Sequence, residues 1–134
     1  MNPASFDILE VLVSERSFKL DYERNIFTGF EPASPANCVT IFDTVGKPPT
    51  STLSGGEEGM FFPSIQVRVR NISYDDGWNL INDIKVFLHD RAKETWGDIL
   101  YCSIICSMEP ALLHWDANKR AVFVTTFNIQ RREI

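Results

Sequence analysis

Apolar and polar residues alternate over positions 65–70, and this spacing predicts a β-strand at 62–70 with one buried face. The apolar side carries Ile65, Val67 and Val69. The polar side carries Gln66, Arg68 and Arg70. After residue 71 the apolar residues follow the spacing of an amphipathic helix. The segment therefore predicts a strand that leads directly into a helix.

The predicted helix begins after Ser73 and ends near residues 89–91. Ser73 is a preferred N-cap residue, and Asp76 stands where a capping box places its acidic or amide side chain. The expected apolar face of this helix consists of Tyr74, Trp78, Ile81, Ile84, Phe87 and Leu88. We expect this face to pack against the sheet as part of the core.

Further elements are expected on both sides of this unit. A helix is predicted at 2–15, with Asn2 as its cap and Pro3 at its first helical position. A polar turn at 116–119 favours an antiparallel hairpin. The other predicted strands are 26–30, 38–43, 99–108 with a continuation at 111–115, and 121–132.

The segment 46–60 contains four of the seven glycines, two of the seven prolines and almost no apolar residues. Such a composition does not build a core, so it predicts a flexible loop or a protruding arm. Long loops in small domains are often functional, and contact with a neighbouring protein is the function we expect here. The alternative is a connector without a role of its own.

The order of these elements predicts a single α+β domain over residues 1–134. Strands joined by a hairpin argue against a doubly wound parallel sheet. We expect one mixed, largely antiparallel sheet, flanked by two main helices and carrying a long protruding loop.

Composition narrows the classes of function. The chain carries 18 acidic and 13 basic residues, so a general attraction to nucleic acid is not expected. No apolar run is long enough to span a bilayer, and the first residues lack the pattern of a signal peptide. The three cysteines, Cys38, Cys102 and Cys106, are too few for a disulfide framework and fit a reducing compartment.

The sequence offers little that is typical of catalysis. Glycine-rich residues 54–57 lack the lysine and the spacing of a phosphate-binding loop. His114 and Asp116 have the residue types of a base and its orienting carboxylate, but a position beside a turn favours a surface role. With only two histidines, a zinc site is not expected. We therefore expect no catalytic residue, no cofactor and no metal ion.

The polar side of the strand 62–70 is the most informative surface in the sequence. Arginine suits interface ion pairs and phosphate contacts, and Arg131 and Arg132 add to this surface if the last strand lies nearby. The alternative is an ordinary solvated sheet face. A platform for nucleic acid would also need stacking aromatic residues, which this side lacks.

Three groups of segments resemble, in order and spacing, the tail-terminator or tail-completion proteins of tailed phages, which are also called phage minor capsid proteins. The first group is 25–32 with 39–43 and Gly46, and the second is 62–70 with 73–76 and the helix 78–88. The third is the pattern Pro110, Leu113, Asp116, Asn118 and Arg120, with the closing strand 123–132. Together they extend from about residue 5 to the end of the chain.

The resemblance implies a structural virion protein of the tail or neck, made in the host cytoplasm. Such proteins form a ring, typically a hexamer, at the head-proximal end of the tail tube, where they stop tube polymerisation and provide the surface that joins the head. The implied partners are further copies of the chain, the tail tube protein and the head–tail connector or neck proteins. Genomic DNA passes through the lumen without specific binding, and no membrane is involved.

The sequence is also compatible with two other functions: a neck or head-closure connector, or a small α+β module that binds a ligand or peptide. The residues that we expect at the interface with other subunits or the tube are Gln66, Arg68, Arg70, Arg131, Arg132, Lys47, Glu57 and Glu58.

Overall fold

The computed structural model describes residues 1–50 and 59–134. The helices are α1 (Ala4–Ser14), the short 3₁₀ helix η1 (Arg16–Phe18) and α2 (Tyr74–Leu88). The strands are β1 (Ile26–Thr28), β2 (Cys38–Thr50), β3 (Met60–Asn71), β4 (Arg91–Trp96), β5 (Ile99–Trp115) and β6 (Ala121–Glu133).

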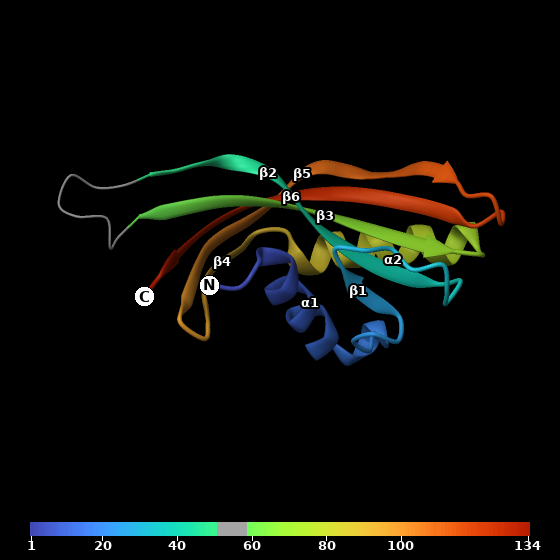
Figure 1. Ribbon diagram of the computed structural model, residues 1–134, viewed down its shortest axis with the longest axis horizontal. Helices are drawn as coiled ribbons and strands as arrows, with labels where there is room; N and C mark the ends of the chain where they lie inside the picture. The colour runs from blue at the N-terminus through green and yellow to red at the C-terminus, as the bar shows by residue number, and fades with distance from the viewer. Residues whose placement is uncertain (51–58) are drawn as a thin grey trace.

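The strands form one six-stranded sheet in the order β1-β2-β3-β6-β5-β4. The pairing of β1 with β2 is parallel, and every other pairing is antiparallel. Helices α1 and α2 both lie against one face of the long, curved sheet, which we call the helix-covered face (Figure 1). The expected α+β class with a mixed, largely antiparallel sheet is therefore confirmed.

The core lies between this face and the two helices. Alternate residues of β3 supply its centre, as the sequence pattern predicted: Ile65, Val67 and Val69. Fully buried aliphatic residues of the helices face them: Ile8 and Leu12 of α1, and Ile81, Ile84 and Leu88 of α2. None of the helices in the described ranges is long and apolar enough to cross a membrane.

Helix α2 begins at the predicted cap. The Ser73 hydroxyl oxygen accepts a hydrogen bond from the Asp76 amide at 3.3 Å. The reciprocal half of a capping box is made by a different residue, because the Ser73 amide donates to Asn71 Oδ1 at 2.8 Å. Asn71 stands at the end of β3, so a single residue ends the strand and helps to begin the helix.

Helix α1 is capped from a distance. The sequence predicted Asn2 as the cap, but the helix begins at Ala4 with Pro3 in the cap position. The Asp43 carboxylate of β2 instead accepts hydrogen bonds from the Ser5 amide at 3.0 Å and the Ser5 hydroxyl at 2.6 Å. A carboxylate at a helix N-terminus satisfies free amides and the positive end of the helix dipole. It also ties α1 to β2.

Within the segment 46–60, residues 46–50 and Met60 belong to regular strands. β2 continues through Gly46 to Thr50, and β3 begins at Met60, so these strands form an arm that extends beyond the helices (Figure 1). Gly46 fits the arm because a Cβ at this position would lie 2.1 Å from the Phe62 carbonyl oxygen. At the described residues the segment is the arm of the two predicted alternatives, and irregular pairing accommodates glycine and proline within the strand. Residues 51–58 lie outside the described residues.

The second half of the sheet contains one strand that the sequence did not predict. β4 pairs with the first part of β5 at the edge of the sheet, and Gly97 turns the chain with a φ of 62°. The largely polar sequence of β4 lacks the apolar pattern by which a strand is predicted, because an edge strand exposes much of its surface. β5 runs from Ile99 to Trp115 with register shifts around Glu109 and Pro110, and the predicted hairpin joins it to β6.

Candidate assembly surfaces

The first candidate surface is the outer face of the sheet, which points away from α1 and α2. Arg68 is partly exposed there, and its Nε donates to Gln66 Oε1 at 2.8 Å. Its guanidinium carbon lies 5.1 Å from the centre of the Phe42 ring. Glu31 reaches this row from the loop after β1, with carboxylate oxygens 4.0 Å from Arg68 Nη1 and 3.6 Å from Arg70 Nη1.

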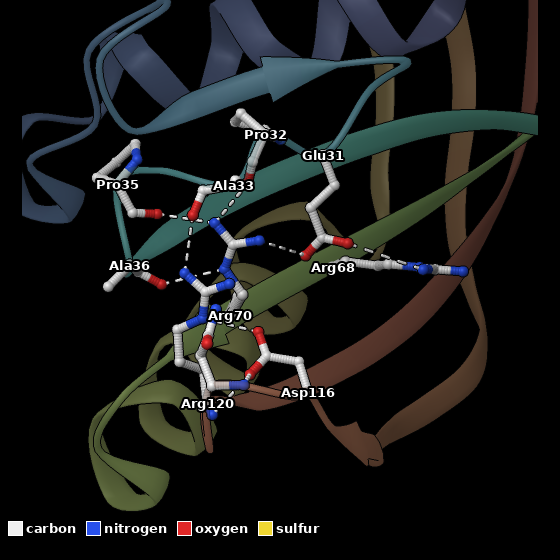
Figure 2. A network of polar contacts seen from close by, with 10 residues as sticks. Glu31, Pro32, Ala33, Pro35, Ala36, Arg68, Arg70, Asp116 and Arg120 are labelled. Carbon is white, nitrogen blue, oxygen red and sulfur yellow. Dashed lines mark hydrogen bonds and ion pairs between the residues drawn. The ribbon is translucent and has the colours of Figure 1, made fainter.

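Arg70 does not belong to an exposed surface, contrary to the sequence-based expectation. Only 4% of it is exposed. Its Nε donates to the Ala36 carbonyl oxygen at 3.1 Å, and its Nη2 donates to those of Pro32 and Pro35 at 2.7 and 2.8 Å (Figure 2). The loop over residues 31–37 covers this end of the outer face, so Arg70 holds that loop on the sheet.

Arg120, the residue directly before β6, also binds this loop. Its Nη1 donates to the Ala33 carbonyl oxygen at 2.8 Å, and its Nε donates to Asp116 Oδ2 at 2.7 Å (Figure 2). Burial alone would raise the pKa of Asp116, but hydrogen bonds from Arg120 and the Asn118 amide outweigh it and lower the pKa. These bonds occupy both carboxylate oxygens, and Asp116 therefore serves the hairpin and the loop rather than orienting His114.

Arg131 lies on the helix-covered face, so the expectation that it extends the arginine row is wrong. Its Nη1 donates to the Asn2 carbonyl oxygen at 3.0 Å and to the Tyr101 hydroxyl at 3.2 Å, and lies 3.5 Å from Asp7 Oδ2. The Tyr101 hydroxyl donates to the same Asp7 carboxylate. Burial and this hydrogen bond raise the pKa of Tyr101. Together, the side chains of Asp7, Tyr101 and Arg131 anchor the start of the chain to β5 and β6.

The remaining predicted interface residues are dispersed. Arg132 is partly exposed, but it lies near the opposite end of β6 from Val124, the residue paired with Arg68. Lys47 is exposed on the arm. Glu57 and Glu58 lie outside the described residues.

The second candidate surface is an aromatic patch that the sequence did not predict, formed by Tyr74, Trp78 and Trp115. These side chains remain 43%, 39% and 51% exposed, although Tyr74 and Trp78 were expected in the core. Tyr74 stacks on Trp115 with ring centres 6.1 Å apart and planes 24° from parallel. Both Tyr74 and Trp78 also contact the buried ring of Phe123. The patch lies at the start of α2, where the sheet ends in the β5–β6 hairpin.

An open cavity of about 600 Å³ lies between the start of α1, the β4–β5 turn and the C-terminus. Its lining includes the acidic residues Asp7, Glu10, Asp98 and Glu133. Within residues 1–50 and 59–134, His, Cys, Asp and Glu form no group suited to holding a metal ion.

Comparison with protein-family models gives a match over residues 12–133, which include every strand of the sheet and α2. The matched family is described as "Bacteriophage tail terminator protein". No curated protein matches the chain.

Proposed function

This chain belongs to the bacteriophage tail terminator family, and on that premise we propose that it forms a closed ring, a hexamer, at the head-proximal end of the tail tube. The ring ends polymerisation of the tube and carries the surface to which the head is joined. The observation that carries the proposal is the family match, which extends across the whole sheet.

The shape of the subunit supports this proposal. A closed ring of identical subunits requires two different, complementary surfaces on each subunit. The arm of β2 and β3 extends from one end of the long axis, and the β5–β6 hairpin forms the other end (Figure 1). Surfaces at opposite ends are accessible to different neighbours at the same time.

The proposal names partners beyond the ring itself. They are the tail tube protein and the head–tail connector or neck proteins, so the protein works in the virion tail after synthesis in the host cytoplasm. DNA passes through the ring without specific binding, which the formal net charge of -5 permits because acidic surfaces do not attract phosphates. The role is structural and involves no catalysis.

The test combines native mass spectrometry of the purified protein with negative-stain imaging of the protein mixed with tail tubes. We expect a discrete closed oligomer, and tubes that stop growing and carry it at one end. Binding to the head connector but not to tubes would instead favour a head-closure protein. A monomer at every concentration, with no effect on tubes, would refute the proposal.

A further inference from the structure

The aromatic patch exposes rings in a fixed arrangement. Trp115 is supported by its stacking on Tyr74, and Tyr74 and Trp78 are supported by Phe123 beneath them. The 38% exposed Leu112 of β5 is paired with Phe123 of β6 and adds an apolar side chain on the same side of the sheet. Aromatic rings clustered on a surface provide large contact areas at low entropic cost, which is why they are enriched at interfaces.

The arm presents a segment of complementary chemistry, which we call the Lys-Pro-Pro segment: Lys47, Pro48 and Pro49. All three are exposed on β2. β1 pairs with β2 only as far as Ile41, and within the described ranges no strand pairs with the outer edge of β2 beyond it. Prolines lack an amide hydrogen, so this edge is unsuited to adding another strand and offers its rings instead.

Extended proline segments bind preferentially to grooves lined by aromatic side chains, since their conformation is already fixed and loses little entropy. Charge favours the same pairing. Lys47 immediately precedes the two prolines, and the exposed carboxylates of Asp75 and Asp76 immediately follow Tyr74 in the first turn of α2. The ammonium group of the arm and the carboxylates at the rim of the aromatic patch therefore carry opposite charges.

We propose that the Lys-Pro-Pro segment of one subunit binds the aromatic patch of the next subunit. The segment belongs to the arm and the patch lies beside the β5–β6 hairpin, so they occupy opposite ends of the long axis (Figure 1). A subunit cannot make the contact with itself, and a head-to-tail contact of this kind closes into a ring when its rotation permits. The inference rests on the proposed ring, because the occupant of the patch is a second copy of the chain.

The test measures the concentration dependence of assembly by sedimentation for the wild-type chain and surface variants. Trp115→Ala, and Pro48→Ala with Pro49→Ala, are each expected to raise the dissociation constant at least about tenfold, the effect of losing a central interface anchor. Combining them is expected to add little, because both remove the same contact. Val86→Ala, at a 75% exposed position of α2 outside the patch, is the matched control and should assemble normally.

A charge reversal tests the electrostatic part. Lys47→Asp places a carboxylate against Asp75 and Asp76 and is expected to weaken assembly by up to about fivefold at low salt, as for exposed pairs. Lys93→Asp, at an exposed position of β4, makes the same charge change elsewhere and should have no effect.

The outcomes separate this inference from the proposed function. If the wild type forms rings and every variant forms them equally well, the inference is refuted and the ring proposal stands. Normal rings that lose only their attachment to tail tubes would assign the patch to the tube protein, which also refutes the inference. A wild type that never assembles refutes both. Circular dichroism of each variant establishes that its fold is retained.

Discussion

The guanidinium of Arg70 lies 2.7 Å from the carbonyl oxygen of Pro32, so a side chain near the end of β3 holds the loop that follows β1. Two further carbonyl oxygens, those of Pro35 and Ala36, receive hydrogen bonds from the same group. Three backbone acceptors converge on one buried cation, and the nearby Glu31 carboxylate completes its environment. The loop thereby becomes a fixed part of the outer face.

Arg70→Met is therefore expected to lower the free energy of unfolding by about 2–4 kcal/mol, because it leaves the loop carbonyls without their donor and the Glu31 carboxylate without its buried partner. The matched control is Arg68→Met, which removes a partly exposed arginine of the same row and should cost about 0–1 kcal/mol. Urea denaturation measures both. Equal losses for the two variants would contradict the structural role of Arg70.

Gly46→Ala is expected to disrupt the arm locally. The added methyl group would meet the Phe62 carbonyl oxygen at 2.1 Å, so β2 and β3 must separate or shift. Hydrogen exchange should accelerate for arm amides such as that of Lys47 and remain unchanged in α2. Gly97→Ala is the control, since it strains a turn of positive φ in open space and should affect only the β4–β5 hairpin. Unchanged protection in the arm of Gly46→Ala would show that the close approach is not required.

Tyr101 is expected to make the protein sensitive to alkaline pH. Its pKa is raised in the folded state from the ordinary value of 10.0, chiefly by burial and then by its bond to Asp7. The folded state therefore retains a proton that the unfolded chain releases, so this stabilisation is complete below about pH 10 and is lost as pH rises further. The free energy of unfolding of Tyr101→Phe should therefore fall less steeply as pH rises in this range. Tyr22→Phe, at a 49% exposed position, should show the same pH dependence of stability as the wild type. A Tyr101→Phe profile parallel to that of the wild type would contradict this account.

Asp116 is expected to make the stability of the protein sensitive to acidic pH. Its pKa is lowered in the folded state because the bonds from Arg120 and Asn118 outweigh the effect of burial. Its contribution is present above the unfolded pKa, near 3.8, and disappears as pH falls through the lower folded value. Asp116→Asn should thus be less stable than the wild type at neutral pH, with a difference that narrows in acid. Denaturation midpoints measured across this range test it, and a difference that widens in acid would be inconsistent.

Much of the fold was predictable from the sequence because β3 and α2 obey simple rules. The alternation of Ile65, Val67 and Val69 assigned one face of the sheet to the core, and Ser73 marked the start of the helix. β4 and the arm were harder to predict from the sequence. β4 is rich in charged residues, and the arm carries glycine and proline within β2, so their pairing depends on neighbouring strands rather than on local pattern.

The candidate surfaces were harder to predict for a physical reason. Alternation assigned Arg70 correctly to the outer face, but no local pattern indicates that a loop thirty-eight residues away in sequence will cover it. Arg131 alternates onto the helix-covered face and is buried against the start of the chain. The exposure of Tyr74 and Trp78 follows from where the sheet ends, which helical spacing cannot reveal. The signal that was available is Trp115, a large aromatic residue directly before a polar turn.

The measurement that most directly tests the central account is the mass of the assembled protein, recorded alone and in the presence of tail tubes. The account predicts a closed ring of identical subunits that binds one end of each tube and stops its growth. A protein that remains monomeric at all concentrations, and leaves tube length unchanged, would contradict it.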